Sequence, residues 1–402
     1  MTSTTDPNAL DQLMSRRVTE IISVDSLKEK LALGRPLRIK FGADPTAPDL
    51  HLGHVVPLKK LREFQDLGHT VVLIIGDYTA LVGDPSGKSK TRPMLTEEEV
   101  QKNAETYLLQ VGRILDVTRL EVRRNSEWFA KMSFTELIQV AAKFTVARMI
   151  ERDDFEKRLK GGMDVHLHEL LYPMMQAYDS VMVEADVEIG GTDQRFNILA
   201  GRELQRKMEL VQQDILLLDP ILVGTDGVQK MSKSLDNYIG VEDDPSDMYG
   251  KVMSIPDSAL WDYWTLVTDE PDESIAEMRT ACESGKMNPR DAKARLARAI
   301  VTELHSSAAA DEAESRFETV FRQGGKPEEI PELAVEDGIT LVDVLVMTGF
   351  VTSKGEARRV IEQGGVKVDD QVITDINALV DIKDGGTVIQ KGKRHFVRLI
   401  KK

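Results

Sequence analysis

Short apolar runs alternate with amphipathic stretches along the first half of the chain. Three of the runs have the length of buried strands: "LRIKFG" (37–42), "TVVLIIG" (70–76) and "ADVEIGG" (185–191). The stretch "LHLGHVVPLKKLREFQDLG" (50–68) predicts a helix between the first two, ending at Gly68. This βαβ rhythm predicts an α/β fold built on a Rossmann-like parallel sheet.

Capping patterns predict where two further helices begin. Thr96 with Glu99 predicts the start of the helix "EEEVQKNAETYLLQVGRIL", and Ser133 with Glu136 predicts another over about 134–150. In this pattern each side chain satisfies a backbone N–H group that the first helical turn leaves unpaired.

The second half has a different pattern. Strand-like runs fade after about residue 245, and residues 274–305 predict helices interrupted by Gly285 and Pro289. The segment 322–338, rich in Gly, Pro and Glu, predicts a linker. Short strand-like pieces such as "GVKVDD" and "TVIQKGKRHFVRLI" follow it. The chain therefore divides into an α/β body, a helical middle and a small mixed α+β tail.

Charge is unevenly distributed along the chain. The 402 residues carry a net charge of -15, which argues against indiscriminate nucleic-acid binding because phosphate contacts need local Lys and Arg. Residues 339–402 contain 11 Lys and Arg against 8 Asp and Glu, whereas residues 1–338 contain 41 against 59. The asymmetry indicates a basic accessory module, although a solvated surface would give the same pattern.

Signals for export or membrane insertion are missing from the sequence. The longest apolar runs are too short to cross a bilayer, and the N-terminus has no basic start followed by an apolar stretch. The single cysteine, Cys282, cannot form an internal disulfide, which is typical of a reducing compartment. We therefore expect a cytoplasmic protein without a membrane partner.

The stretch "FGADPTAPDLHLGH" (41–54) carries the first candidate site. A predicted strand ends at Gly42, and a short loop enters a helix near His51 and His54. In open parallel sheets, ligands bind beyond the carboxyl ends of the strands, where helix N-termini offer free N–H groups to anions. Gly53 lets a flat base approach the backbone. A nucleotide-phosphate site and a merely packed pair of histidines both remain open, whereas a metal site is disfavoured because further ligands are lacking.

The stretch "GDPSGKS" (83–89) is similar to a phosphate-binding P-loop, but its spacing is one residue short. A P-loop needs glycine five positions before the Gly of Gly-Lys-Ser, and Val82 occupies that position. Asp84, Lys88 and Arg92 still place one acid and two bases after a predicted strand. This set suits an ammonium group on one side and phosphates on the other, with a solvated loop as the alternative.

A second basic stretch, "KMSKS" (230–234), follows the turn-forming "VGTDGVQ". Two lysines on a mobile loop can move onto a polyphosphate and neutralise the charge that develops on departing pyrophosphate. The pentapeptide alone is equally compatible with a generic basic loop. Its weight comes from its partner, because HxGH early in an α/β body and KMSKS at the end of that body rarely occur together by chance.

The two motifs together are the signature of class I aminoacyl-tRNA synthetases. In addition, "DPTAPDLHLGH", "GDPSGK", "YPMMQAYDS", "GGTDQRFN" and "KMSKS", in this order, closely resemble the tyrosyl-tRNA synthetase family. The form of the last motif and "NPRDAK" (288–293) resemble its second bacterial subfamily, and residues 340–370 resemble an S4-type RNA-binding domain. The likeness covers nearly the whole chain. It implies a catalytic domain at 1–245, a helical anticodon-side domain at 246–325, a linker at 326–338 and an S4-like domain at 339–402.

The resemblance implies activation of tyrosine by ATP, with Mg²⁺, to tyrosyl-adenylate and pyrophosphate, followed by transfer of tyrosine to the terminal ribose of tRNA(Tyr). Such enzymes work by placing the carboxylate in line with the α-phosphate and stabilising the leaving group, without a protein nucleophile or a tightly bound metal. The residues that match the family's catalytic positions are Thr46, His51, His54, Lys88, Arg92, Lys230 and Lys233. The further ATP-binding positions are Asp44, Gly53, Gly191, Asp193, Met231, Ser232 and Ser234.

Six residues match the tyrosine-binding positions of the family. They are Lys40, Asp84, Tyr172, Gln176, Asp179 and Gln194. Asp84, Tyr172 and Gln176 match positions that hold the α-ammonium group. Gln194 matches a position near the carboxylate, and Asp179 matches the residue that accepts a hydrogen bond from the phenol. Apart from the resemblance, the three residues from "YPMMQAYD" would equally be ordinary polar contacts on one helix face.

The chain departs from the family pattern in front of the Gly-x-Asp-Pro loop. Many members have a tyrosine and then a cysteine there, which contact the phenol and the ribose, whereas this chain has Lys40 and Phe41. The cysteine contact is therefore lost. The phenol contact does not carry over directly, and two roles stay open for Lys40: donating a hydrogen bond to the phenol or pairing with Asp179.

The tail and the quaternary structure complete the expectations. The basic residues that we expect to meet tRNA phosphates, reading shape more than base edges, are Lys354, Arg358, Arg359, Lys391, Lys393 and Arg394. A solvated basic face is the alternative. Members of the family are homodimers, and residues 143–155 resemble their interface region.

Three other classes of protein share some of these features. Tryptophanyl-tRNA synthetases share the fold and both signatures, but Asp179 and the S4-like tail favour tyrosine. Small-molecule adenylyltransferases also use HxGH, yet they lack a helical domain and an RNA-binding tail. A non-catalytic RNA-binding protein would not need both histidines and both lysines intact.

Overall fold

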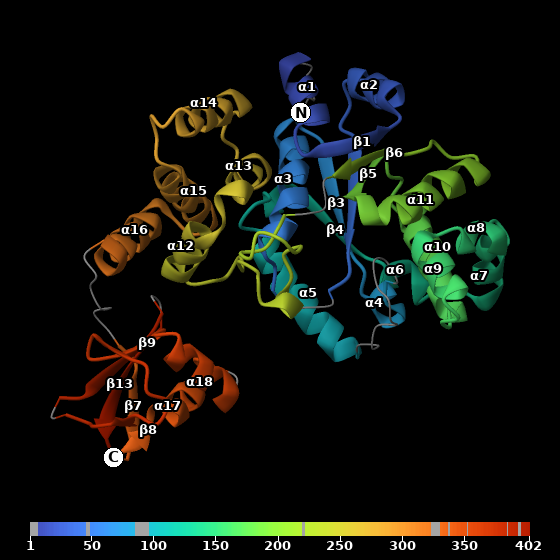
Figure 1. Ribbon diagram of the computed structural model, residues 1–402. Helices are drawn as coiled ribbons and strands as arrows, with labels where there is room; N and C mark the ends of the chain where they lie inside the picture. Colours follow the sequence, from blue (N-terminus) through green and yellow to red (C-terminus); the bar gives the residue numbers. More distant parts are fainter. Residues whose placement is uncertain are drawn as a thin grey trace. The chain divides into compact units, whose positions relative to one another are not determined.

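The computed structural model divides the chain into two compact units, Met1–Asp311 and Glu312–Lys402, which are described separately (Figure 1). The residues that the structure describes are 7–45, 49–84, 96–218, 222–322, 330–336, 338–351, 353–383, 385–392 and 395–402.

The first unit is built on a six-stranded sheet with the order β1-β6-β5-β2-β3-β4. Its strands are β1 (Val18–Ile22), β2 (Arg38–Ala43), β3 (Thr70–Ile75), β4 (Leu120–Arg124), β5 (Val187–Gly191) and β6 (Asp214–Leu218). All neighbours run parallel except the edge strand β1, which is antiparallel to β6. The strands predicted near residues 37–42, 70–76 and 185–191 are confirmed as β2, β3 and β5. From β2 the chain proceeds outward to β3 and β4 and later returns to β5 on the other side, so the carboxyl ends of β2 and β5 flank the topological switch point.

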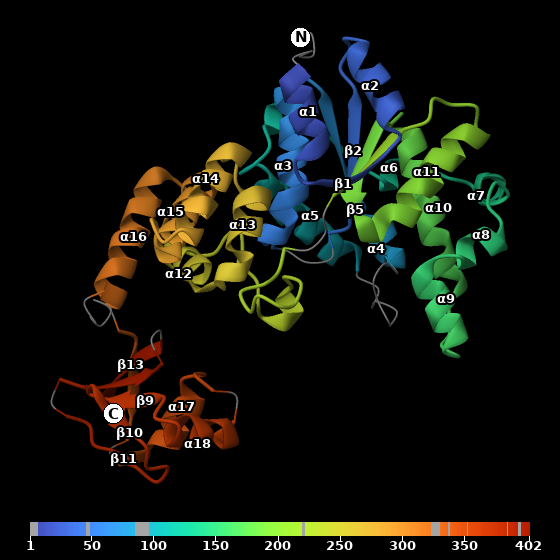
Figure 2. The same cartoon turned by 45° about the horizontal axis from the view of Figure 1, so that its top comes forward.

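Helices cover both faces of this sheet, with α3 and α5 on one side and α10 and α11 on the other (Figures 1 and 2). The helices of this region are α1 (Pro7–Ser15), α2 (Val24–Ala32), α3 (Leu52–Asp66), α4 (Thr79–Val82), α5 (Glu97–Val111), α6 (Ser126–Phe129), α7 (Phe134–Ala141), α8 (Val146–Ile150), α9 (Asp153–Lys160), α10 (Leu167–Met182) and α11 (Arg195–Lys207). Both predicted capping boxes are confirmed: the Thr96 hydroxyl accepts from the Glu99 N–H group, and the Ser133 hydroxyl accepts from the Glu136 N–H group.

Helices alone follow in the predicted helical middle. They are α12 (Pro245–Ser254), α13 (Leu260–Val267), α14 (Asp272–Glu283), α15 (Pro289–Leu304) and α16 (Ser307–Arg322). Gly285 falls in the break between α14 and α15, and Pro289 is the first residue of α15, so both interrupt the helices as predicted. A proline suits the first helical position because it has no N–H group to leave unpaired.

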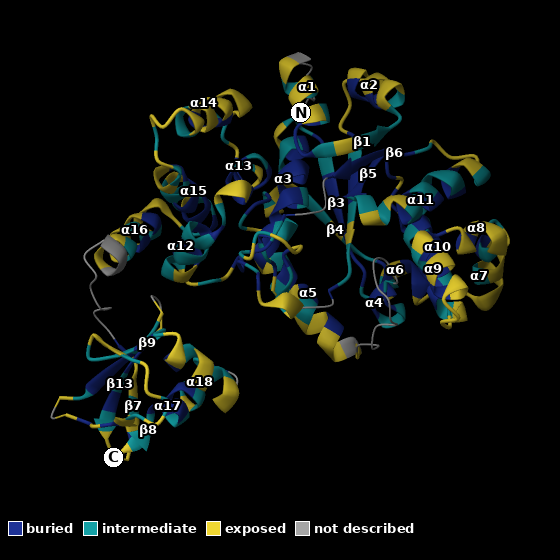
Figure 3. Ribbon diagram, in the orientation of Figure 1, coloured by how far each residue is buried: buried dark blue, intermediate teal, exposed yellow. Residues whose placement is uncertain are grey.

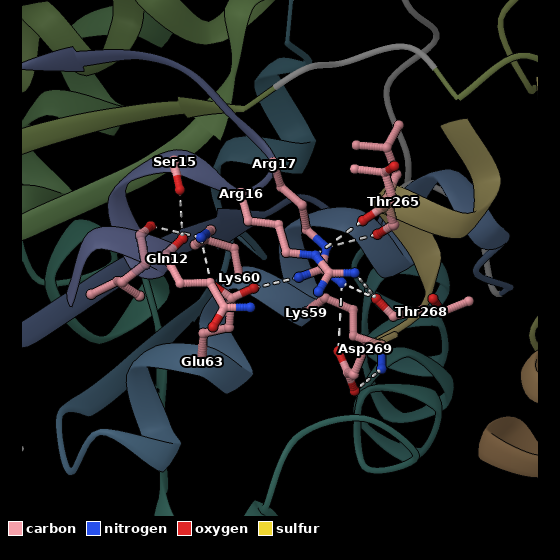
Figure 4. Close-up of polar contacts among 12 residues, drawn as sticks. Gln12, Ser15, Arg16, Arg17, Lys59, Lys60, Glu63, Thr265, Thr268 and Asp269 are labelled. Carbon is pink, nitrogen blue, oxygen red and sulfur yellow. Dashed lines mark hydrogen bonds and ion pairs between the residues drawn. The ribbon is translucent and has the colours of Figure 1, made fainter. Parts of the chain in front are cut away.

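A cluster of charged residues, in which the cations Arg17 and Lys59 are buried, fixes this helical segment to the body of the first unit (Figure 4). Arg17, next to β1, donates from Nε to the Leu266 carbonyl oxygen at the end of α13 (2.9 Å) and pairs with Glu63 of α3. Lys59 of α3 reaches the Asp269 carboxylate, with 2.6 Å between Nζ and Oδ2. Buried cations are tolerated only when paired in this way. The cluster therefore clamps the second half of α3 between the N-terminal segment and α13.

The second unit carries a five-stranded sheet with the order β10-β9-β12-β13-β7 and a two-stranded sheet of β8 and β11. The elements beyond α16 are β7 (Glu332–Val335), β8 (Ile339–Thr340), α17 (Leu341–Met347), α18 (Lys354–Glu362), β9 (Val366–Val368), β10 (Gln371–Ile373), β11 (Leu379–Val380), β12 (Thr387–Lys391) and β13 (His395–Lys401). The predicted linker at 326–338 thus contains β7, which pairs in parallel with β13. Val335 of β7 is buried in the core of this unit, so the sheet begins before residue 339.

Candidate active site

The HxGH histidines cap the N-terminus of α3 at the carboxyl edge of the sheet. Nδ1 of His51 accepts a hydrogen bond from the Gly53 N–H group, and Nδ1 of His54 accepts one from the His51 N–H group (both 3.2 Å). A neutral imidazole has one donor and one acceptor nitrogen, so each Nε2 carries the hydrogen and is the donor. A Cβ atom at Gly53 would lie 3.0 Å from the His51 ring, which explains the glycine. The pair forms a capping box that also presents two Nε2–H donors.

Both histidines are neutral at physiological pH. Burial, with His54 and the KMSKS lysines nearby, lowers the pKa of His51 to about 3. Burial, with the positive charge of Lys230 adding to it, lowers the pKa of His54 to about 4. Groups with such pKa values do not exchange protons near pH 7, so they serve as hydrogen-bond donors and not as a general acid and base.

Backbone pairing joins the start of α3 to the segment after KMSKS. The Leu52 N–H group donates to the Ile239 carbonyl oxygen (3.0 Å), and the Val241 N–H group donates to the Leu50 carbonyl oxygen (2.9 Å). Nζ of Lys233 lies 2.5 Å from Oδ2 of Asp49, at the entry to α3. Two motifs about 180 residues apart in the sequence therefore lie at one place.

The side chain of Asn237 holds the backbone of the KMSKS segment through hydrogen bonds. Its Oδ1 accepts from the Ser232 N–H group (2.8 Å), and its Nδ2 donates to the Lys230 carbonyl oxygen (3.2 Å) and to the Asp226 carboxylate (2.9 Å). A Cβ atom at Gly224 would lie 2.2 Å from Asn237 Nδ2, so glycine is required there. Buried Asn237 thus fixes the backbone that carries the two lysines.

Asp179, on α10, is a buried carboxylate with two donors. The Trp128 indole N–H donates to Oδ1 (2.9 Å), and the Asn125 amide donates to Oδ2 (3.3 Å). Burial raises the pKa of Asp179 to about 7, against the opposing effects of Lys40 and the two donors. A carboxylate accepts up to about four hydrogen bonds, so it retains capacity for a further donor such as a phenol.

Tyr172, another predicted tyrosine-binding residue, lies in a hydrogen-bonded set with Asp44 and Thr79. The Tyr172 hydroxyl donates to Asp44 Oδ2 (2.8 Å), and Asp44 Oδ1 accepts from the Thr79 hydroxyl (2.8 Å). Burial and the neighbouring carboxylates, Asp44 first, raise the pKa of Tyr172 well above its usual value, so the phenol stays protonated. Asp44, assigned to ATP by the family pattern, is therefore in contact with the predicted tyrosine side.

Asp84 and Gln194 form a second set around a buried arginine. Gln194 Nε2 donates to Asp84 Oδ2 (3.0 Å), and its Oε1 accepts from the Asn197 amide (2.9 Å). Arg152, at the start of α9, lies 3.8 Å from Asp84 Oδ1 and donates to Asn197 Oδ1 (3.3 Å). Arg152 thus supports Asp84 directly and Gln194 through Asn197. It belongs to residues 143–155, the segment that resembles the interface region of the family.

The predicted pairing of Lys40 with Asp179 is wrong. Nζ of Lys40 instead bonds Glu188 Oε1 (2.8 Å), the Ser180 hydroxyl (2.7 Å) and the Gln176 carbonyl oxygen (2.9 Å). Glu188 lies opposite Lys40 on the neighbouring parallel strand β5, which is why it is the nearer acid. Lys40 has no hydrogen left for the phenol, because its ammonium group has three hydrogens and these three bonds use them all.

The other predicted residues are placed as follows. Gly191 ends β5, Asp193 is exposed in the short turn after it, Met231 is buried, and the Ser232 and Ser234 hydroxyls are 2.9 Å apart. Arg358 and Arg359 are exposed on α18, Lys354 pairs with Asp343 (2.7 Å), and Lys391 bonds the Phe350 carbonyl oxygen. The predicted residues outside the described part of the chain are Thr46, Lys88, Arg92, Lys393 and Arg394.

The residues that hold the predicted site residues in place were not predicted from the sequence. Asn125 and Trp128 follow β4, and Asn237 follows KMSKS; all three are buried polar groups. The position of "RRNSEW" at the carboxyl end of a strand was a usable signal for the first two. Arg152 and Asn237 carried no such signal.

Neither a clustered metal site nor a membrane-spanning helix emerges from the described ranges. Within them, three or more His, Cys, Asp or Glu side chains do not gather in an arrangement that would hold a metal ion. Within the same ranges, helices are all too short or too polar to cross a membrane.

The pKa of Asp179 predicts how tyrosine binding depends on pH. A phenol donates best to the ionised carboxylate, so binding should strengthen as the pH rises through about 7. For a single group with this pKa, we expect the dissociation constant of L-tyrosine to fall about tenfold between pH 6 and pH 8. Calorimetric titration at several pH values measures this, and a flat profile would contradict the assignment of Asp179.

The geometry defines a class of protein. A Rossmann-like sheet whose carboxyl edge carries an HxGH helix start, joined to a KMSKS segment, is the catalytic architecture of class I aminoacyl-tRNA synthetases. Comparison agrees: residues 32–322 match the family described as tRNA synthetases class I (W and Y), and residues 310–399 match the tyrosine–tRNA ligase SYY-like C-terminal domain.

Curated relatives narrow the class. The tyrosine–tRNA ligase of Dehalococcoides mccartyi (strain CBDB1) is 50% identical over 395 residues, covering 98% of this chain and 99% of the relative. That of Thermotoga maritima is 48% identical, covering 98% of each chain. The chain belongs to the tyrosine–tRNA ligase family, and it is an enzyme, a ligase.

Solved structures agree on the fold. A C-terminally truncated mitochondrial tyrosyl-tRNA synthetase of Aspergillus nidulans superposes with a TM-score of 0.66 at 22% identity, over 78% of this chain and 94% of that one. The Archaeoglobus fulgidus tyrosyl-tRNA synthetase complexed with L-tyrosine gives 0.62 at 24% identity, over 76% of this chain and 99% of that one.

Proposed function

We propose that this chain activates L-tyrosine with ATP, releasing pyrophosphate, and transfers the tyrosyl group to the 3′-terminal ribose of tRNA(Tyr). The observation that carries the proposal is the backbone pairing of Leu52 and Val241 with the opposite segment, which unites HxGH with KMSKS. The names of the relatives support tyrosine over tryptophan as the amino acid.

The phosphate side of the site uses the two motifs. The Nε2–H groups of His51 and His54 donate to ATP oxygens, and Lys230 and Lys233 neutralise the departing pyrophosphate. The capping box fixes the two histidines before the reaction, so their stabilisation of the developing charge needs little reorganisation. Lys233 first has to exchange Asp49 for a phosphate oxygen. In the proposal, the further catalytic residues are Thr46, Lys88 and Arg92. The further ATP-binding residues are Asp44, Gly53, Gly191, Asp193, Met231, Ser232 and Ser234.

The tyrosine side uses α10 and the ends of the neighbouring strands. Asp179 accepts a hydrogen bond from the substrate phenol. Tyr172, Gln176 and Asp84 hold the α-ammonium group, and Gln194 lies near the carboxylate. The Asp84–Gln194 hydrogen bond (3.0 Å) supports one common pocket for the ammonium and carboxylate groups. Mg²⁺ would enter with ATP, held by phosphate oxygens, because ATP-dependent enzymes bind this ion mainly through the nucleotide.

The second unit, with its basic residues, contacts tRNA. Arg358 and Arg359 are exposed on α18, where their charges face solvent. We assign them, with Lys354, Lys391, Lys393 and Arg394, to tRNA phosphates. Lys391 and Lys354 first have to exchange their present partners, Phe350 and Asp343, for phosphate oxygens.

A homodimer explains an exposed apolar face on the first unit. Phe134 (77% exposed), Val146 (71%) and Leu167 (76%) are the first residues of α7, α8 and α10, and both α7 and α8 pack on α10 (Figure 3). Exposed apolar side chains grouped in this way mark an interaction surface. The chain is assigned to the cytoplasm, where its bacterial relatives' substrate, tRNA, is charged.

Removing the second unit separates the two steps of the proposed reaction. A chain truncated after residue 322 keeps the HxGH and KMSKS segments and loses β7 together with its partner β13. We expect tyrosine-dependent exchange of pyrophosphate into ATP within about threefold of the full chain, and tRNA charging reduced by at least tenfold because phosphate contacts are lost. Assays with labelled pyrophosphate and labelled tyrosine measure the two steps. Unchanged charging would refute the role of the second unit, and Arg358→Ala/Arg359→Ala in the full chain is the milder matched variant.

A further inference from the structure

A buried ion pair, Lys40–Glu188, contacts Gln176, one of the residues assigned to tyrosine. Lys40 on β2 is 0% exposed and Glu188 on β5 2% exposed, and their charged atoms are 2.8 Å apart. Burying two charges is costly unless their hydrogen-bonding capacity is filled. Such a pair in contact with a residue assigned to the substrate therefore calls for a function.

All the hydrogen bonds of Lys40 are internal. Its ammonium group has three hydrogens, and they meet Glu188 Oε1, the Ser180 hydroxyl and the Gln176 carbonyl oxygen at 2.7 to 2.9 Å. None remains for a ligand. Lys40 is thus a positioning residue, which attaches α10 to β2.

Glu188 is saturated with donors in the same way. Its Oε1 accepts from Lys40 and from Gln176 Nε2 (3.2 Å), and its Oε2 accepts from the Ser180 hydroxyl (2.8 Å) and from Gln213 Nε2. Four donors surround the group, so it is held as a carboxylate. Lys40 supplies the positive charge that makes this ionised state tolerable in a buried place.

The carboxylate decides which way the Gln176 amide faces. An amide has an NH₂ group that donates and an oxygen that accepts, whereas a carboxylate only accepts. The NH₂ group of Gln176 must therefore point at Glu188, and its oxygen points the other way. Gln176 is only half-buried, so this oxygen is the part of the side chain available to a ligand.

We propose that the Lys40–Glu188 pair sets the polarity of the Gln176 amide, so that an acceptor oxygen faces the α-ammonium group of tyrosine. An ammonium group only donates, and an amide turned to present NH₂ would oppose it. The proposal rests on the assignment of Gln176 to the ammonium group. It explains why lysine and glutamate occupy positions that themselves touch no substrate.

The test compares L-tyrosine with 3-(4-hydroxyphenyl)propanoate, which lacks the ammonium group. Dissociation constants for both are measured calorimetrically on the full chain and on Lys40→Met/Glu188→Gln, which removes both charges together. Hydrogen bonds to charged groups are worth about 10- to 100-fold in affinity. We expect the preference for L-tyrosine to fall by that factor in the double variant, with the affinities for the analogue and for ATP unchanged.

The matched control is another buried ion pair of the first unit, between Lys30 on α2 and Asp214 on β6. Lys30 and Asp214 are 2.9 Å apart, and their side chains are 9% and 0% exposed. Lys30→Met/Asp214→Asn should lower the melting temperature to a similar degree while leaving the preference for L-tyrosine intact. Where the first double variant does not fold, Glu188→Asp keeps both charges but withdraws the carboxylate from Gln176, and we expect a roughly three- to tenfold loss of the preference.

Three results would overturn the proposal. Parallel losses for tyrosine and the analogue would show that the pair merely shapes the pocket, and an unchanged preference would show that it positions nothing. A preference that persists in Gln176→Leu would remove the assignment on which the proposal rests. Tyrosine binding that is absent from the unmodified chain would instead refute the proposed function itself.

Discussion

Lys233→Ala should lower the rate of tyrosyl-adenylate formation by two to three orders of magnitude. Removal of one preorganised group that stabilises charge in the transition state typically has an effect of about 10²- to 10³-fold on kcat. Nζ of Lys233 lies 2.5 Å from Oδ2 of Asp49, which precedes the N-terminus of α3. In the proposed function Lys233 contacts the leaving group only as pyrophosphate departs, so the KM values for ATP and tyrosine should change by less than about threefold.

The control for this prediction is Lys251→Ala. Lys233 and Lys251 both lie beside Tyr238, at 5.8 Å and 5.2 Å from the centre of its ring. Lys251 is outside the KMSKS motif and pairs with Asp243 at 2.6 Å. Single-turnover formation of adenylate, followed by rapid quench, measures both variants. A Lys233→Ala variant that raises KM for ATP while keeping its rate would show a ground-state contact in place of the proposed role.

Asp179→Ala should weaken tyrosine recognition far more than ATP recognition. The variant removes the phenol's acceptor, and a hydrogen bond to a charged group is worth about 1.5–3 kcal/mol, or about 10- to 100-fold in kcat/KM for tyrosine. The activity with phenylalanine should change much less, because that substrate offers no hydroxyl group. The ratio of the two activities should therefore fall, with the KM for ATP unchanged.

The same substitution leaves two donors unpaired. The Trp128 indole and the Asn125 amide lose their shared acceptor, which should lower the melting temperature measurably. Tyr178→Phe, on the same helix, is the control for a general disturbance of α10. Equal losses for tyrosine, phenylalanine and ATP in Asp179→Ala would contradict its assigned role.

Local patterns predicted much of the fold because they report local physics. The capping boxes at Thr96 and Ser133 and the strands β2, β3 and β5 depend on residues close together in the chain. The strands β1, β7, β4 and β6 were not predicted. The edge strands β1 and β7 are held by distant partners, β6 and β13, so their sequences alone give little sign of pairing.

The candidate site divides in the same way. Residues in motifs, such as His51 and Asp179, were predicted because the resemblance fixes them one by one. Lys40 was misassigned because its partner, Glu188, lies 148 positions away and only the parallel register of β2 with β5 brings them together. Asn237 and Arg152 were missed because they hold other residues in place, and no short sequence motif marks such a role.

The central claim is that one site joins tyrosine to ATP. Amino-acid-dependent exchange of labelled pyrophosphate into ATP tests it most directly, with tyrosine, tryptophan and phenylalanine supplied in turn to the purified chain. We predict rapid exchange with tyrosine and at least a hundredfold less with the other two, since phenylalanine lacks the hydroxyl that we propose Asp179 to bind. Exchange driven by tryptophan alone, or by none of the three amino acids, would contradict the account.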